Sequence, residues 1–155
     1  MPLYEGNAIM SVEVLKMSQS AYISLVQGSK IDAITLDDVK EQLRQYQEQT
    51  ELTGRQLGWD YGAAAFPYGI EQKPEAQDQW FYLKGNNPLH RYIVIGTGTR
   101  ESEGTSVPYI QVVLPDGSTH GDKAKANELC KWIGKRLQAE VKMFNGRTFY
   151  FNPRK

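Results

Sequence analysis

The chain has 155 residues, of which 40% are hydrophobic and 23% charged, and its 18 Lys and Arg are balanced by 18 Asp and Glu. This composition excludes a disordered chain, and the zero formal net charge excludes the general attraction to nucleic acids or membranes that a strongly basic protein has. The length is that of one domain, large enough to bury a core without disulfides or structural metals.

The first 16 residues have no clear hydrophobic period and contain Met1 and Met10, while Met17 follows directly. Codons for Val12-Glu13-Val14 can include a purine-rich ribosome-binding sequence ahead of Met17. We therefore hypothesise that residues 1–16 are a non-core extension that is absent from the native protein, and that residues 17–155 form one domain. The alternative is an ordinary N-terminal tail.

The first predicted elements are a strand and a long helix. Residues 21–27 are rich in β-branched and aromatic side chains and stop at Gly28, which predicts a strand. Thr35 is an N-cap candidate, and the spacing predicts a helix over 36–53 with Gly54 beyond its end. The apolar stripe of this helix is Leu36, Val39, Leu43, Tyr46 and Thr50.

An irregular region precedes three further strands. Residues 55–77 mix aromatics with glycines and show neither the helical nor the strand period of hydrophobicity. This predicts a packed loop, with a polar turn over 73–78. Three apolar runs then predict an antiparallel meander with turn chemistry between its strands. The runs are 80–84, 91–95 and 107–114, and the connection over 96–106 is glycine-rich.

A second helix is predicted over 122–141, followed by a turn at Asn145-Gly146 and a last strand over 148–151. The order is therefore β-α-(loop)-β-β-β-α-β. Helices separated by a run of strands indicate an α+β protein, with a mainly antiparallel sheet and both helices on one face as a two-layer sandwich.

No pattern of catalytic or ligand-binding residues stands out. Cys130 is the single cysteine and lies on the apolar stripe of the second helix, where a thiol behaves as a small hydrophobe. His90 and His120 sit beside turns without metal-ligand spacing. Glu101 and Glu103 would repel phosphate from the glycine-rich loop. We predict no catalytic residue, no metal and no cofactor. No secretion signal or spanning run is visible, so we expect a cytoplasmic protein.

Two segments are candidates for contact with a partner. The first is the aromatic segment 59–82, whose rings either complete the core or line a binding surface. Its candidate contact residues are Trp59, Tyr61, Phe66 and Tyr68. The second is the basic face of the second helix, with Trp132 near its edge. Its candidate residues are Lys123, Lys125, Lys131, Lys135 and Arg136.

The charge is unevenly distributed along the chain. Residues 1–80 carry 6 Lys and Arg against 12 Asp and Glu, whereas residues 81–155 carry 12 against 6. Our leading hypothesis is a non-enzymatic protein-interaction or regulatory domain. The acidic first part and the basic last part of the chain would also permit head-to-tail self-association. The alternative is a nucleic-acid-binding module that uses the basic face of the second helix. An enzyme without a recognisable motif is the third hypothesis.

Residues 58–68, the stretch from Met17 to Leu43, and the ending Phe149-Tyr-Phe-Asn-Pro153 together resemble a family of small uncharacterised proteins from endospore-forming Gram-positive bacteria. The resemblance covers the chain from about residue 17 onward. It implies a one-domain α+β fold and a start near Met17. It implies no activity and no site residues.

Overall fold

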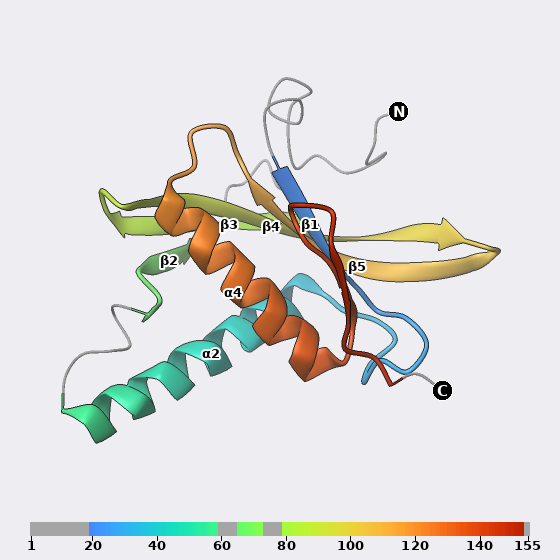
Figure 1. Cartoon of the computed structure of the whole chain (residues 1–155), viewed down its shortest axis with the longest axis horizontal. Coiled ribbons are helices and arrows are strands. Elements are labelled where there is room, and N and C mark those ends of the chain that lie inside the picture. The colour runs from blue at the N-terminus through green and yellow to red at the C-terminus, as the bar shows by residue number, and fades with distance from the viewer. Residues whose placement is uncertain (1–18, 59–64, 73–78, 154–155) are drawn as a thin grey trace.

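The computed structural model describes residues 19–58, 65–72 and 79–153. The extension proposed at 1–16 and the polar turn predicted over 73–78 lie outside the described residues. The protein is α+β, as predicted, with a seven-stranded sheet and helices α2 and α4 (Figure 1). The elements in chain order are β1 (Gln19–Ser24), α2 (Leu36–Leu57), β2 (Tyr68–Glu71), β3 (Trp80–Asn87), β4 (His90–Ser102), β5 (Thr105–Leu114), α4 (His120–Leu137), β6 (Glu140–Lys142) and β7 (Thr148–Tyr150).

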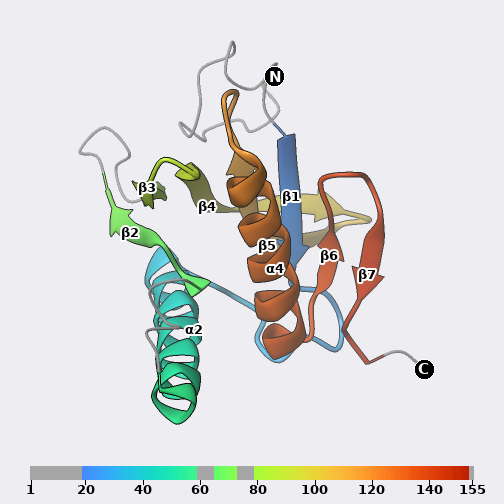
Figure 2. The same cartoon turned by 60° about the vertical axis from the view of Figure 1, so that its left-hand side comes forward.

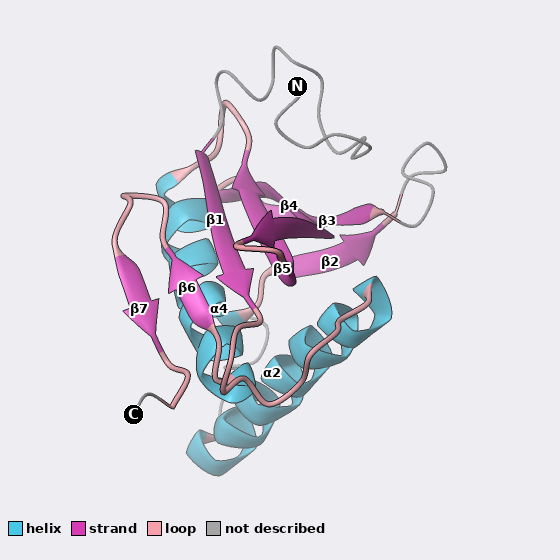
Figure 3. Ribbon diagram, turned by 90° about the vertical axis from the view of Figure 1, so that its right-hand side faces the viewer, coloured by secondary structure: helices cyan, strands magenta, loops and turns pink. Residues whose placement is uncertain are grey.

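The strands are arranged in the order β2-β3-β4-β5-β1-β6-β7, and every neighbouring pair is antiparallel. The predicted meander is present as β3-β4-β5. The predicted order lacks β2 and β6, so the predicted loop before β3 contains a strand that pairs with β3. Figure 3 shows β1 inside the sheet, between β5 and the short β6–β7 hairpin.

The core is built from alternate residues of the central strands and the apolar stripes of both helices. Ala21 and Ile23 of β1, and Ile93 and Ile95 of β4, are at most 1% exposed and belong to one cluster. The same cluster contains Leu43 of α2 together with the apolar stripe of α4. Fully burying an aliphatic side chain of this size contributes about 1.5–3 kcal/mol. This cluster therefore holds both helices to the sheet.

Helix α2 begins as predicted and ends later than predicted. Thr35 caps it through a capping box, in which the hydroxyl of Thr35 accepts from the amide of Asp38 and the carboxylate of Asp38 accepts from the amide of Thr35. Gly54 is wrong as the terminating glycine, because it is buried inside the helix. The helix ends at Gly58, whose left-handed φ of 78° suits glycine and whose amide donates to the carbonyl of Gly54.

Helix α4 ends earlier than predicted. Gln138 adopts a left-handed φ of 52°, and the amide of Ala139 donates to the carbonyl of Gly134, which closes the helix. The chain then leaves as β6. Ala139, Val141 and Met143 are at most 4% exposed and follow the two-residue period of a strand. The predicted end of the helix at Val141 is therefore wrong.

The glycine-rich connection predicted over 96–106 is mostly strand. β4 and β5 stay paired as far as Ser102 and Thr105, and the turn is formed by Glu103 and Gly104, with φ of 51° and 79°. This hairpin extends beyond the rest of the sheet (Figure 1). Because it runs into a strand and not into a helix, it lacks the helix N-terminus of a phosphate-binding loop.

Candidate functional site

The N-terminal end of α4 is anchored by the buried carboxylate of Asp122. Asp122 is 0% exposed and forms a capping box with Thr119. Its carboxylate also accepts from the amide of Arg91, at 3.1 and 3.2 Å, and from the hydroxyl of Tyr68, at 2.5 Å. Both carboxylate oxygens therefore have donors, as a buried charge requires. This arrangement joins α4 to β2 and to the start of β4.

One turn further along α4, Lys125 forms a second buried contact. Its ammonium group donates to the hydroxyl of Tyr46 and to the carboxylate of Glu128, both at 2.9 Å. Tyr46 in turn donates to Glu128. Sequence periodicity placed Lys125 on the basic face, but its side chain is only 11% exposed. We call Tyr46, Tyr68, Asp122, Lys125 and Glu128 the anchoring cluster.

Two buried side chains, the hydroxyl of Tyr68 and the thiol of Cys130, keep their protons at neutral pH. Burial, followed by the hydrogen bond to Asp122, raises the pKa of the Tyr68 hydroxyl far above its ordinary range. Burial likewise raises the pKa of the Cys130 thiol to about 12, so this cysteine stays protonated at neutral pH. Cys130 is 0% exposed, which confirms its predicted place in the core.

The C-terminal half of α4 presents cations to solvent beside the aromatic rings of Phe149, in β7, and of Phe151, just after it. Lys131 and Lys135 are exposed, and their ammonium groups lie 5.2 and 5.9 Å from the ring centres of Phe149 and Phe151. The guanidinium of Arg147 lies 5.6 Å from the ring centre of Phe149. Figure 2 shows α4 beside the β6–β7 hairpin. We call Lys131, Lys135, Arg147, Phe149 and Phe151 the basic–aromatic surface.

Close packing of the hairpin on α4 brings these residues together. A Cβ atom on Gly134 would lie 2.3 Å from a methyl carbon of Val141 and 3.1 Å from the ring of Phe151. Only a residue without a side chain lets the hairpin approach so closely. The two phenylalanine rings stack with an interplanar angle of 8° and centroids 6.0 Å apart. The two rings are therefore held in fixed positions against Lys131 and Lys135.

The basic–aromatic surface contains cations without a carboxylate partner. Within residues 19–58, 65–72 and 79–153, the ion pairs are those of Arg44 with Glu41 and of Lys125 with Glu128. Glu128, one helical turn before Lys131, is already engaged by Lys125 and Tyr46. The charge on this surface is thus available for a partner.

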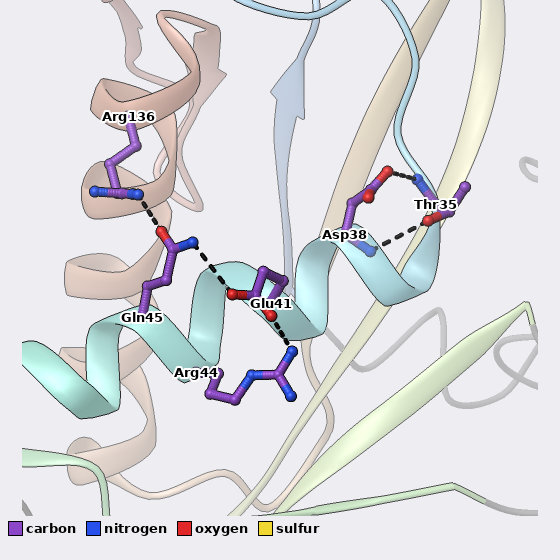
Figure 4. A network of polar contacts seen from close by, with 6 residues as sticks. All are labelled: Thr35, Asp38, Glu41, Arg44, Gln45 and Arg136. Carbon is purple, nitrogen blue, oxygen red and sulfur yellow. Dashed lines mark hydrogen bonds and ion pairs between the residues drawn. The ribbon is translucent and has the colours of Figure 1, made fainter.

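The other side of α4 faces α2 through a polar network (Figure 4). The guanidinium of Arg136 lies 4.7 Å from the ring of Trp132 and donates to the side-chain carbonyls of Gln42 and Gln45. Gln45 donates to Glu41, which also pairs with Arg44. Arg136, a candidate contact residue from the sequence, is therefore fixed between the two helices.

A depression of about 530 Å³ lies between the start of α2, the end of α4 and the β1–α2 loop. Its apolar lining comes from Ile31, Ala33, Ile34 and Leu137. Its basic lining comes from Lys30, Lys135 and Arg136, so Lys135 borders both this depression and the basic–aromatic surface.

The structure separates the remaining candidate residues. Phe66 and Tyr68 are 4% and 3% exposed and belong to the core cluster, whereas Trp59 and Tyr61 lie outside the described residues. Lys123 is exposed at the opposite end of α4 from Lys135, about 18 Å along the helix at 1.5 Å per residue. It is therefore not part of the basic–aromatic surface.

The two histidines lie near each other, beside the start of α4. His90 and His120 line a depression of about 560 Å³ together with Lys123. His90 also contacts the ring of Tyr68 at a centroid distance of 5.4 Å. In the described part of the chain, no group of three or more His, Cys, Asp or Glu side chains is placed to hold a metal ion.

Arg147, Phe149 and Phe151 are site residues that sequence reasoning did not find. The available signal was the alternation of Phe149 and Phe151 in the last strand, which places both rings on one face. That this face meets Lys131 and Lys135 depends on the packing of the hairpin and has no sequence pattern.

Among the residues described, no helix has the length and apolar character needed to cross a membrane.

Comparisons with known proteins agree with this fold. No curated protein matches the chain. A crystal structure of a protein of unknown function from Bacillus stearothermophilus is 40% identical, covers 77% of this chain and 90% of its own, and superposes with a TM-score of 0.52. Residues 19–153 match a family described as a domain of unknown function, DUF1885. The chain therefore belongs to the DUF1885 family.

Proposed function

We propose that the protein is a non-enzymatic protein-interaction domain whose basic–aromatic surface binds an acidic segment of a partner protein. The observation that carries the proposal is the arrangement of Lys131, Lys135 and Arg147 over the rings of Phe149 and Phe151, without carboxylate partners in the described ranges. Cations held over aromatic faces lose less freedom when they bind an anion than unsupported side chains do.

An acidic protein segment fits this surface better than a nucleic acid does. Single-stranded nucleic acids bind by stacking bases on free aromatic faces. Here Phe149 already contacts Lys131, Arg147 and Phe151, and Phe151 also contacts Lys135. The rings therefore orient the cations and leave little free ring face on which a nucleobase could stack. A carboxylate can bind the cations without contacting a ring face.

Binding to a fluorescein-labelled peptide of about ten glutamates tests the proposal by fluorescence anisotropy. We expect binding at about 20 mM salt that weakens about tenfold at 150 mM, where screening shortens electrostatic reach to about 8 Å. Lys131→Glu with Arg147→Glu should lower the affinity a further tenfold or more. The matched control is Lys84→Glu with Arg55→Glu, which makes the same charge change at two exposed positions on other elements.

Two results would contradict the proposal. An equal loss in both double variants would mean that the peptide senses net charge and not this surface. Tighter binding of a single-stranded oligothymidylate than of the peptide, with the same dependence on Lys131 and Arg147, would favour the nucleic-acid alternative. Sedimentation at low and high salt tests whether the acidic ligand is a second copy of the chain, as head-to-tail self-association requires.

We also propose three finer properties. The first is a two-layer sandwich with both helices on one face of the sheet, supported by the larger of two core clusters, which both helices share with alternate strand residues. The second is a cytoplasmic location, supported by Cys130 as a lone buried thiol. The third is restriction of the family to endospore-forming Gram-positive bacteria, supported by the Bacillus stearothermophilus relative. Fractionation of cells and a census of genomes test the last two.

A further inference from the structure

The depression between α2 and α4 has a composition different from that of the basic–aromatic surface. One part of its lining is apolar, from Ile31, Ile34 and Leu137, and Ile31 leaves 38% of its surface exposed. An isoleucine exposed at the mouth of a concave region offers apolar area that a partner side chain can cover.

The carboxylates around this depression are already bonded within the protein, whereas two of its lysines have no ion pair among the described residues. Asp38 is held in the capping box of α2, and Glu41 is held by Arg44 and Gln45 (Figure 4). Lys30 and Lys135 form no ion pair in the part of the chain that the structure describes. The lining contains three cations, from Lys30, Lys135 and Arg136, against these two carboxylates, so its net charge is positive. It therefore favours the same acidic ligands as the basic–aromatic surface.

The walls of the depression are fixed by hydrogen bonds before any ligand binds. The amide of Lys30 donates to the carbonyl of Leu137 at 2.8 Å, and the hydroxyl of Ser29 donates to the carbonyl of Gln138 at 2.9 Å. These bonds attach the β1–α2 loop to the end of α4. Arg136, donating to Gln42 and Gln45, fixes the opposite wall. A preformed site binds without a large ordering cost.

We propose that this depression receives an aliphatic side chain of the acidic segment that lies on the basic–aromatic surface. The ligand is then an acidic peptide with an apolar anchor, and Lys135 is the residue at which the two parts of the site meet. This inference rests on the proposed function, because it assigns the chemistry of the same ligand. Charge brings the segment to the surface, and the anchor fixes its register.

Two labelled peptides of equal length and charge test the inference. Both carry about ten glutamates; one ends in a Leu-Ile pair and the other in Ser-Ser. We expect the Leu-Ile peptide to bind the native protein about tenfold more tightly, the effect of burying one aliphatic side chain. Backbone amide signals of Ile31, Ala33 and Leu137 should shift on titration with the Leu-Ile peptide and not with the Ser-Ser peptide.

A variant that fills the depression separates this inference from the proposed function. Ala33→Trp, at an exposed loop position that lines the depression, should abolish the preference for Leu-Ile and leave Ser-Ser binding unchanged. The matched control is Ala124→Trp on the exposed side of α4, which should keep the preference. Equal affinity of the two peptides for the native protein would overturn the inference alone. Failure of both peptides to bind would overturn the proposed function as well.

Discussion

The two halves of α4 carry similar residues and use them in opposite ways. In the N-terminal half, Asp122 and Lys125 are buried and bonded to Tyr68, Tyr46 and Glu128 within the anchoring cluster. In the C-terminal half, Lys131 and Lys135 are exposed, form no ion pair among the described residues, and hold their ammonium groups near the rings of Phe149 and Phe151. A charge whose donors and acceptors are satisfied inside the protein has a structural role. A charge that is oriented but unpaired is free to bind a partner.

The largest effect that this comparison predicts is that of removing the Asp122 carboxylate. Asp122→Ala leaves the amides of Thr119 and Arg91 and the hydroxyl of Tyr68 without their acceptor. Loss of a cap costs about 1 kcal/mol and each buried donor left unpaired about 1–3 kcal/mol. We expect urea unfolding to report a loss of about 3 kcal/mol or more.

The control for this variant is Asp116→Ala, at an exposed turn position before the same helix. It should change the free energy of unfolding by less than about 0.5 kcal/mol. Equal stability of the two variants would show that the Asp122 contacts do not hold α4, and the structural half of the comparison would fail.

Most of the strands and helices that the sequence predicted correctly have a sustained period. The stripe of α2 from Leu36 to Tyr46 and the apolar runs of β3, β4 and β5 are long enough to distinguish a helix from a strand. β6 has three residues, and its Val141 continued the helical stripe of α4 equally well. Only the left-handed conformation of Gln138 separates the two elements, and this conformation is rare outside glycine and asparagine.

The candidate site was predictable only in its helical part. Lys131, Lys135 and Arg136 follow from the polar face of an amphipathic helix. Lys125 was misplaced because its spacing fits either the edge of the buried stripe or the polar face, and its burial depends on Tyr46 of α2. Arg147 lies two residues before Phe149, so the alternation of a strand places both on one face, but no local pattern places that face against Lys131 and Lys135.

A smaller effect is predicted for the hydroxyl of Tyr68. Tyr68→Phe removes one donor to Asp122 and retains the ring contact with His90, so we expect a loss of about 2 kcal/mol at neutral pH. The control Tyr92→Phe, at a half-buried ring beside Arg91, should cost less than about 0.5 kcal/mol.

The pH dependence of this difference has a definite sign. The pKa of Tyr68 is raised in the folded protein by burial and by the bond to Asp122, so folding favours the protonated hydroxyl. Its contribution is complete below the unfolded pKa of about 10 and falls as the pH rises above that value. The stability advantage of the native protein over Tyr68→Phe should therefore shrink above about pH 10 in urea titrations. An advantage that grows there would contradict the assignment.

The sharpest test of the comparison replaces the same residue type in each half of α4. Lys125→Ala removes donors to Tyr46 and Glu128 and should lower the free energy of unfolding by about 1–2 kcal/mol, because a buried acceptor loses its partner. Lys131→Ala removes an exposed side chain and should cost less than about 0.5 kcal/mol.

Binding of the glutamate peptide should rank these two variants in the opposite order. Lys131→Ala removes a cation that Phe149 orients toward solvent, so the affinity should fall about threefold to fivefold, as expected for one surface charge. Lys125→Ala should retain the native affinity, since its ammonium group is already shared between Tyr46 and Glu128. If one variant lowered both stability and binding while the other changed neither, position along α4 would not separate structural from binding charges. If Lys125→Ala lowers mainly stability and Lys131→Ala lowers mainly peptide affinity, then α4 uses one lysine for structure and the other for binding.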